Sequence, residues 1–337
     1  MAYNSKVVKK VLTDMQNKEK KAILDAKKRK NELYIKLPEL RELDEKLIGT
    51  YKEIIGRIGS SINPIDDTTV KLDDIKADNQ SLQKQRKLIL EQHGYSADYT
   101  EPVYNCKNCS DTGYRNDDMC VCLKRALALE SVNESGFGDI IKSQNFKNFS
   151  LDYYKKDTSN ENKDEAECSP YEQMAMVLEQ CKNYAKRFGQ SNSSVRHLIF
   201  VGGTGLGKTH MSSAIAGEII KKGYDVYYNS AQNILSSFEK ERFSYRNEFD
   251  ADIIERYRSC DLLIIDDLGT EYTGSVYATS LYGLINARLA ANKAMLITTN
   301  LGYEDMRRKY DERIVSRILG EFATVYFVGD DIRMQKE

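Results

Sequence analysis

The sequence lacks an excess of charge of either sign, and it has no long apolar run. Its 337 residues include 50 Lys and Arg against 51 Asp and Glu, which gives a formal net charge of −1. This balance excludes a protein coated uniformly in positive charge for nucleic-acid binding. No apolar run of about 18 residues occurs, which excludes a transmembrane helix, and the first residues are not typical of a signal peptide. We therefore expect a cytoplasmic protein that does not contact a membrane.

Tryptophan is absent, and the three histidines show no spacing typical of metal ligands. Cysteine is the residue that could bind a metal, because Cys106, Cys109, Cys120 and Cys122 lie close together. In a reducing compartment such a cluster indicates a metal rather than disulfides. Two close pairs joined by a turn can supply the four thiolates of a tetrahedral structural Zn²⁺ site. The second pair has an unusually short gap, so an iron–sulfur cluster or a redox pair is the alternative.

The N-terminal part of the chain shows the apolar spacing of amphipathic helices. Apolar residues recur every three or four positions over about residues 1–30, from Pro38 onward and over about residues 69–92. We therefore predict a coiled-coil-like helical region over residues 1–100. This pattern fits a self-contained domain as well as an arm that binds a partner protein. A zinc module over 101–125, a linker over 126–143 and a catalytic domain over 144–337 would follow.

A phosphate-binding loop follows a short apolar strand at residues 197–201, and a helix pattern follows the loop. Its residues are Gly202, Gly203, Thr204, Gly205, Leu206, Gly207, Lys208 and Thr209. Glycines let backbone N–H groups surround phosphate oxygens, and the helix N-terminus adds positive potential. We expect Lys208 to reach the β- and γ-phosphates of ATP and the Thr209 hydroxyl to hold Mg²⁺.

Two consecutive carboxylates end an apolar run at residues 262–265. Such a run is typical of a parallel strand that is buried on both faces. Asp266 is expected to hold Mg²⁺ through water, and Asp267 to polarise the attacking water. Asn300 ends another strand, where it is expected to orient that water or sense the γ-phosphate. An ordinary turn asparagine is the alternative.

Further strands are predicted over residues 225–229, 294–300 and 324–328. Together with the two strands above they make five strands separated by helices. This order predicts an α/β fold, a three-layer sandwich around a five-stranded parallel sheet.

These motifs together resemble the AAA+ ATPases. More closely, they resemble the bacterial helicase loaders of the DnaC/DnaI type and the IstB transposition helpers. The resemblance covers residues 144–337 and is carried by residues 202–209, 262–269, 298–300, 312–317 and 329–333. Most AAA+ enzymes have Glu where Asp267 stands, so this sequence matches the loaders rather than the wider family. That difference implies slow hydrolysis of ATP to ADP and phosphate, stimulated by DNA or a partner.

The resemblance also implies roles for single residues. Arg317 is similar to the arginine finger that reaches a neighbouring subunit, Arg313 is the second candidate for that role, and Arg333 is similar to the second sensor arginine. A salt bridge is the alternative for Arg313. Phe146 and Phe149 stand where the residues that flank adenine stand in similar proteins, although plain core packing fits them equally well. The few residues after the last predicted strand lead us to expect no C-terminal helical lid, as in the loaders.

The function implied is ATP-dependent loading of a hexameric replicative helicase onto single-stranded DNA. The N-terminal region would bind the helicase, and the AAA+ domains would self-associate and hydrolyse ATP at their interfaces. A helix expected over residues 230–246 would contact the DNA through Lys240, Arg242, Tyr245 and Arg246. An IstB-like transposition helper is one alternative, and an adaptor that binds ATP with little hydrolysis is another.

Overall fold

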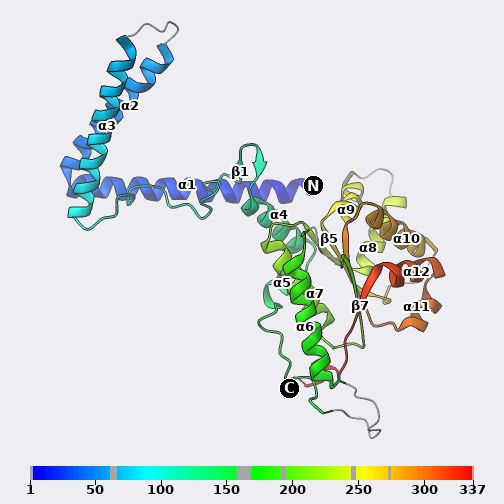
Figure 1. Ribbon diagram of the computed structural model, residues 1–337. Coiled ribbons are helices and arrows are strands. Elements are labelled where there is room, and N and C mark those ends of the chain that lie inside the picture. Colours follow the sequence, from blue (N-terminus) through cyan, green and yellow to red (C-terminus); the bar gives the residue numbers. More distant parts are fainter. Residues whose placement is uncertain are drawn as a thin grey trace. The chain divides into compact units, whose positions relative to one another are not determined.

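The computed structural model divides the chain into two compact units, Asp14–Thr112 and Met1–Thr13 with Gly113–Glu337 (Figure 1). The residues that it describes are 3–60, 67–157, 168–190, 195–243, 248–271 and 275–335. The first unit is called the helical unit, and the second unit, which contains the expected phosphate-binding loop, is called the nucleotide-binding unit. The domain boundaries expected at residues 100, 125 and 143 stay predictions.

Three helices dominate the helical unit, as the apolar spacing predicts. They are α1 (Ser5–Lys36), α2 (Pro38–Ser60) and α3 (Asp67–Gln92). Leu37 alone separates α1 from α2. Proline lacks a backbone N–H and fits the first helical position, so Pro38 ends one helix and begins the next. Leu33, Leu37, Leu40 and Leu90 form a buried cluster where the helices meet.

A buried carboxylate holds these helices together. Asp44 on α2 accepts hydrogen bonds from the Tyr34 hydroxyl at 2.7 Å and from Arg86 Nε at 2.7 Å. The Lys30 ammonium lies 3.1 Å from the same carboxylate. Burial opposes ionisation of Asp44, but these hydrogen bonds outweigh it and hold its pKa below the ordinary value. A charge paired in this way fixes the geometry of the three helices.

The nucleotide-binding unit is built on a five-stranded sheet in the order β4-β5-β6-β3-β7, and every neighbouring pair of strands is parallel. The strands are β3 (His197–Val201), β4 (Val226–Ser230), β5 (Leu262–Leu268), β6 (Ala294–Thr299) and β7 (Phe322–Tyr326). The expected α/β fold class, a sandwich of helices around a five-stranded parallel sheet with an N-terminal helical region, is confirmed.

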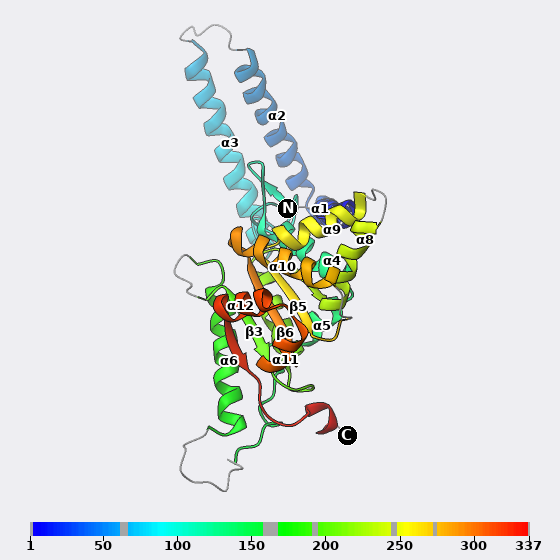
Figure 2. The same cartoon turned by 90° about the vertical axis from the view of Figure 1, so that its right-hand side faces the viewer.

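Helices cover both faces of this sheet (Figure 1 and Figure 2). Successive strand residues point to opposite faces, so Leu198 and Phe200 enter one buried cluster and Ile199 enters the other. The first face is covered by α4 (Val121–Glu134), α5 (Gly138–Ser143), α6 (Pro170–Arg187) and α7 (Lys208–Lys221). The second face is covered by α8 (Ala231–Phe243), α9 (Glu248–Ser259), α10 (Ser275–Ala290), α11 (Tyr303–Lys309) and α12 (Glu312–Glu321).

Several predicted strands have different bounds in the structure. β7 begins at Phe322, two residues before the predicted strand, because α12 ends at Glu321 and the chain passes directly into the sheet. The helix predicted over residues 230–246 corresponds to α8 (Ala231–Phe243), and residues 244–246 lie outside the described part of the chain. In the part of the chain that the structure describes, no helix combines the length and the apolar character that crossing a membrane requires.

A buried arginine joins the second layer of helices to the sheet. Arg288 on α10 is fully buried and donates to the carbonyl oxygens of Tyr257, Cys260 and Ala294 at 2.5, 3.0 and 2.6 Å. These oxygens lie near the end of α9 and at the starts of β5 and β6. Arg288 therefore connects the end of α9 to the starts of β5 and β6.

The loss of these hydrogen bonds should destabilise the unit strongly. Arg288→Met keeps much of the side-chain volume but removes every donor, so we expect the free energy of unfolding to fall by about 3 kcal/mol or more. Chemical denaturation of the full chain measures this change. Arg258→Ala, at an exposed side chain of α9, is the matched control and should change it by less than about 0.5 kcal/mol. Equal effects of the two variants would contradict the role given to Arg288.

Candidate functional site

The phosphate-binding loop joins β3 to α7 and has a backbone that only glycine adopts readily. Gly205 and Gly207 have φ angles of 75° and 85°, in the left-handed region. A Cβ atom on Gly205 would lie 1.7 Å from Oδ1 of Asp331. Glycine at these positions lets the loop curl tightly, so that its N–H groups and the start of α7 face one small volume.

Lys208 is the first residue of α7 and is almost entirely buried. Its Nζ donates to the carbonyl oxygens of Gly202 at 2.7 Å and Gly203 at 2.5 Å. Burial lowers the pKa of Lys208, although Asp267 and Asp266 oppose that shift. The two carboxylates therefore favour the charged form, which is the form that binds phosphate oxygens.

Asp266 lies buried near the end of β5 and receives two hydroxyl donors. Thr298 Oγ1 donates to its Oδ1 at 2.6 Å, and Thr209 Oγ1 donates to its Oδ2 at 3.2 Å. Burial raises the pKa of Asp266, and the charge of Asp267 raises it further, although the Thr298 hydrogen bond opposes both. Hydroxyl and carboxylate oxygens are ligands that Mg²⁺ prefers, so Thr209 and Asp266 fit the expected metal.

Asp267 is exposed and points away from the buried side of β5. Its φ angle is 54°, and its backbone N–H donates to Thr298 Oγ1 at 2.9 Å. Thr270 Oγ1 donates to the Asp267 carbonyl oxygen at 2.8 Å. Asn300 follows the neighbouring strand β6 and faces the same cavity. The structure therefore brings Asp267 and Asn300 together, as their positions at the ends of parallel strands predict.

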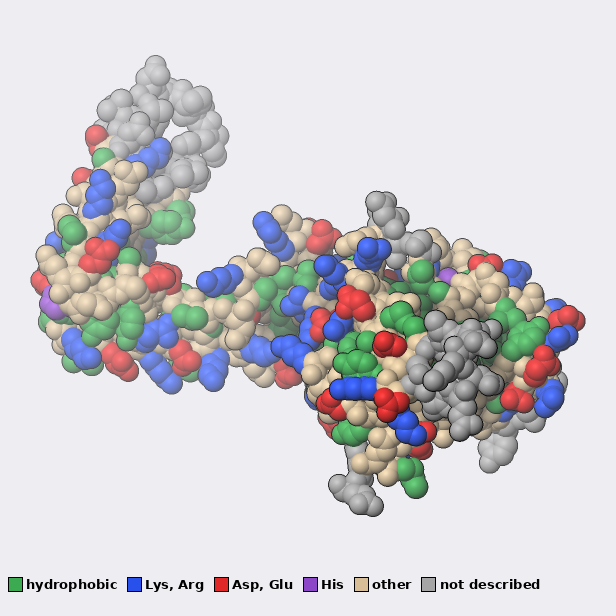
Figure 3. Space-filling view, turned by 60° about the horizontal axis from the view of Figure 1, so that its bottom comes forward, with side chains coloured by type: hydrophobic (Ala, Val, Ile, Leu, Met, Phe, Trp, Pro, Cys, Tyr) green, Lys and Arg blue, Asp and Glu red, His purple; other side chains and the backbone are tan. Residues whose placement is uncertain are grey.

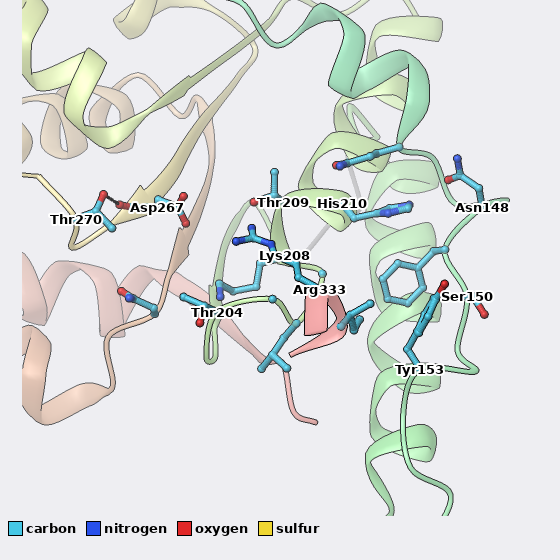
Figure 4. Close-up of a pocket in the computed structure, with 17 residues that line it drawn as sticks. Asn148, Ser150, Tyr153, Thr204, Lys208, Thr209, His210, Asp267, Thr270 and Arg333 are labelled. Atoms are coloured by element: carbon cyan, nitrogen blue, oxygen red, sulfur yellow. Dashed lines mark hydrogen bonds between the residues drawn. The ribbon is translucent and has the colours of Figure 1, made fainter. Parts of the chain in front are cut away.

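These groups surround a cavity of about 300 Å³ (Figure 4). Its wall combines residues of the phosphate-binding loop and the start of α7 with residues from four other segments of the chain. The lining residues are Gln144, Asn148, Phe149, Ser150, Tyr153, Thr204, Gly205, Leu206, Gly207, Lys208, Thr209, His210, Asp267, Thr270, Asn300, Ile332 and Arg333. Arg333 comes from the short helix η1 (Ile332–Gln335), so its guanidinium can face a phosphate. One end of the cavity thus contains both cations, Lys208 and Arg333, and the carboxylate of Asp267. This end suits the phosphate chain of a nucleotide and its metal.

The opposite end of the cavity is aromatic and polar. Phe149 is buried there and meets His210 edge-on, with 5.2 Å between ring centres. Gln144, Asn148 and Tyr153 complete this wall. This is the part of the cavity that suits a nucleotide base, and Phe149 lies in it as expected.

Phe146 is not among the residues that line this cavity, and its expected place beside the base stays a prediction. A turn, in which the Asn148 N–H donates to the Asn145 carbonyl at 3.3 Å, separates Phe146 from Phe149. Phe146 instead lines a second cavity between α4, α5 and α7. Sequence analysis also missed Tyr153 and His210. The only sequence signal for them was their proximity to Phe149 and Thr209.

The two arginines of α12 lie outside the lining of the cavity. Arg313 makes a two-point ion pair with Asp311 at 3.0 Å and lies over the Tyr282 ring at 5.5 Å. Arg313 holds the pKa of Asp311 down to about 2. The local salt bridge named as the alternative for Arg313 is therefore present. Arg317 is exposed on the same helix, and the assignment of a finger to either residue stays a prediction.

The four clustered cysteines come together locally. The sulfur atoms of Cys106, Cys109, Cys120 and Cys122 all lie within 4.8 Å of one another. A short antiparallel hairpin, β1 (Tyr114–Arg115) with β2 (Asp118–Met119), follows the first pair. Thiolates bound to one Zn²⁺ lie about 3.8 Å apart, given Zn–S distances of about 2.3 Å. This donor set therefore fits zinc.

The residues expected to contact DNA are only partly described. Lys240 is exposed on α8. Arg242 lies on the same helix, and its side chain is outside the described part of the chain. Tyr245 and Arg246 also lie outside the described residues. The DNA contacts therefore stay predictions.

Comparison with known proteins identifies the domain that carries the cavity. Residues 190–336 match the family described as IstB-like ATP binding protein. The chain is 25% identical over 158 residues to the replicative helicase loader DnaC of Escherichia coli (strain K12) and to that of Buchnera aphidicola subsp. Schizaphis graminum (strain Sg). Each match covers 47% of this chain and 63% of the relative. A crystal structure of the DnaC helicase loader has a TM-score of 0.42 at 21% identity, over 54% of this chain and 98% of that chain.

The segment that matches the IstB-like ATP binding family, residues 190–336, is the domain that carries the phosphate-binding loop. This domain contains the phosphate-binding loop, Asp266, Asp267, Asn300 and Arg333. The chain spans less than two thirds of the length of the curated relatives.

Thr298 should control the affinity for nucleotide with Mg²⁺. Thr298→Val keeps the shape of the side chain but removes the hydroxyl shared by Asp266 and the Asp267 N–H. We expect affinity in the presence of Mg²⁺ to fall about ten-fold, since a hydrogen bond to a charged group is worth about 1.5–3 kcal/mol. Titration with a fluorescent ATP analogue, with Mg²⁺ and with EDTA, measures this. Thr324→Val on β7 is the control. An equal loss in EDTA would contradict a role through the metal.

The cysteine cluster should retain zinc through purification. We expect about one zinc per chain by elemental analysis, and near zero in a variant with both Cys106→Ser and Cys109→Ser. Cys168→Ser is the control, because Cys168 is exposed and lies outside the cluster. Iron in place of zinc would indicate the iron–sulfur alternative, and protein without metal would contradict both.

Proposed function

We propose that the chain, whose residues 190–336 are an IstB-like ATP-binding domain, is an ATPase that loads a replicative DNA helicase onto single-stranded DNA. The observation that carries this proposal is the cavity at the carboxyl end of the sheet. It brings Lys208, Thr209, Asp267 and Asn300 together, with Asp266 hydrogen-bonded to Thr209. The similarity to DnaC supports loading as the task that this ATPase serves.

Different residues of the cavity would have different roles in hydrolysis. Lys208 and the N–H groups of the loop would bind the phosphate oxygens, and Thr209 with Asp266 would hold Mg²⁺, which neutralises phosphate charge. Asp267 would accept the proton of the attacking water, and Asn300 would orient that water. An aspartate reaches less far than a glutamate from the same backbone position, which supports slow hydrolysis.

A second chain would complete the site. Arg317 and Arg313 lie on the exposed side of α12 and away from their own cavity, so they can reach the nucleotide of a neighbouring subunit. Arginines placed in this way stabilise the charge that develops during phosphoryl transfer. Hydrolysis would then depend on self-association through the ATPase domains, with Arg333 acting at the nucleotide of its own subunit.

The helical unit is the proposed contact for the helicase, together with the zinc module. In Figure 3 acidic and basic side chains are interspersed along this unit, and apolar side chains reach the surface between them. Ile35 and Tyr51 are 82% and 62% exposed, and Leu88 is also exposed. Large apolar groups exposed on a helical surface favour a protein partner over DNA. Lys240, Arg242, Tyr245 and Arg246 are the proposed contacts for single-stranded DNA, and the cytoplasm is the proposed location.

Two alternatives differ in the partner or in the chemistry. The family match to IstB-like proteins favours a transposition helper. An adaptor that binds ATP with little hydrolysis would suit a cavity in which Asp267 is a weak base. The DnaC similarity favours the loader over both.

A deposition assay separates the three functions. Full-length protein is mixed with the replicative helicase of its own source, ATP and circular single-stranded DNA, and helicase hexamers on the DNA are counted. We expect deposition to depend on this protein. Lys208→Ala should abolish deposition and phosphate release, because the phosphate oxygens lose their cation. Lys221→Ala, at the exposed end of α7, is the matched control.

The outcomes of this assay are distinct. Deposition with no difference in phosphate release between wild type and Lys208→Ala would contradict the ATPase and favour the adaptor. Binding and deposition that are both absent would contradict the loader, and a transposase would be the next partner to test.

A further inference from the structure

Glu271 has a buried carboxylate that the proposed chemistry does not use. It follows the loop that begins with Asp267, and it is 4% exposed. Its Oε2 accepts a hydrogen bond from the Gly269 N–H at 2.7 Å, and its Oε1 accepts one from the Tyr310 hydroxyl. The carboxylate therefore joins the Asp267 loop to a segment that is 39 residues away in the sequence.

Lys309 reinforces the same junction. It is the last residue of α11, and its Nζ donates to the carbonyl oxygen of Gly269 and, at 3.0 Å, to that of Glu271. Burial and the hydrogen bond to Glu271 raise the pKa of Tyr310 well above its ordinary value, so the hydroxyl remains a donor. A buried carboxylate with partners on two sides keeps them in fixed relative positions, since separating any one of them leaves a buried group unpaired.

Each side of this junction leads to a different functional element. On one side, Thr270 and Asp267 both line the nucleotide cavity and are hydrogen-bonded to each other at 2.8 Å. On the other side, Tyr310 is followed by Asp311, the N-cap of α12, whose side chain accepts from the Arg313 N–H at 2.9 Å. The junction therefore connects the floor of the cavity to the start of the arginine helix.

We infer that Glu271 is a positioning residue that transmits nucleotide contact at Asp267 to helix α12. This inference rests on the proposed function, because α12 matters to the reaction only if its arginines act on a neighbouring subunit. A nucleotide that shifts the Asp267 loop must carry Gly269 and Glu271 with it. Tyr310 follows because it is hydrogen-bonded to Glu271, and Lys309 follows because it is hydrogen-bonded to both Gly269 and Glu271. The Glu271 carboxylate thus makes the solvent exposure of helix α12 depend on whether a nucleotide occupies the cavity. A coupling of this kind needs a direct measurement on both elements.

Hydrogen–deuterium exchange measures both elements at once. Full-length protein is compared with and without Mg²⁺ and a non-hydrolysable ATP analogue. In the wild type we expect the analogue to slow exchange in peptides covering residues 266–271 and in those covering residues 311–321. In Glu271→Ala we expect the first effect to persist and the second to fall by at least half. Affinity for the analogue should stay within about two-fold, because Glu271 does not line the cavity.

Two further variants keep the test decisive. Glu304→Ala, at an exposed residue of α11, is the matched control and should behave as wild type. Tyr310→Phe removes one hydrogen bond and keeps the ring. It replaces Glu271→Ala if that variant does not fold. The effect of the analogue on exchange at residues 311–321 should then also fall by at least half. Glu271→Gln retains the side-chain shape and should restore most of the coupling.

The results separate this inference from the proposed function. A wild type in which the analogue leaves residues 311–321 unchanged would overturn the inference, and so would coupling that persists in Glu271→Ala. Affinity for the analogue that falls together with thermal stability would show a merely structural role and would also overturn it. A wild type that couples the two elements but releases no phosphate would contradict the ATPase while supporting the inference.

Discussion

The Thr298 hydroxyl is the group on which the arrangement of acids at the carboxyl end of the sheet depends. It donates to Asp266 at 2.6 Å and accepts from the N–H of Asp267 at 2.9 Å, so one side chain orients two successive acids. The second hydrogen bond accompanies a left-handed backbone at Asp267, which is unfavourable for a residue with a side chain by about 1–2 kcal/mol. That backbone conformation turns the second carboxylate into the cavity while the first stays buried beside Thr209. Neighbouring residues of one strand thereby acquire different environments and different tasks.

Much of this site follows from contiguous sequence. A glycine-rich loop between a strand and a helix has few possible conformations, and carboxylates after a buried parallel strand must lie at the same edge of the sheet. Lys208, Asp267 and Asn300 were therefore placed together correctly. Phe146 does not line this cavity, because a single turn between two nearby aromatic residues decides which cavity each one faces. The spacing of apolar residues in the sequence does not predict that turn.

The remaining contacts join residues that are far apart in the chain. Tyr310 reaches Glu271, and the Arg256 guanidinium lies 4.4 Å from the centre of the Tyr3 ring. The apolar spacing of α1 correctly predicted a helix. It could not show that the first residues pack with the nucleotide-binding unit, where Lys10 pairs with Glu130 at 2.5 Å. An unbroken helical pattern fixes local conformation, whereas the choice of partner depends on surfaces formed elsewhere.

The hydrogen bonds around Asp267 connect its position in the cavity to a segment outside the cavity. Asp267 is exposed, and its reach into the cavity is set by backbone hydrogen bonds rather than by packing of its side chain. Its position therefore depends on the loop that ends at Glu271, and that loop is bonded to the segment preceding α12. Because burial of an unpaired carboxylate is unfavourable by several kcal/mol, the loop and the helix are expected to move together. Nucleotide binding in the cavity and the position of the α12 arginines would then depend on each other through this hydrogen-bond network.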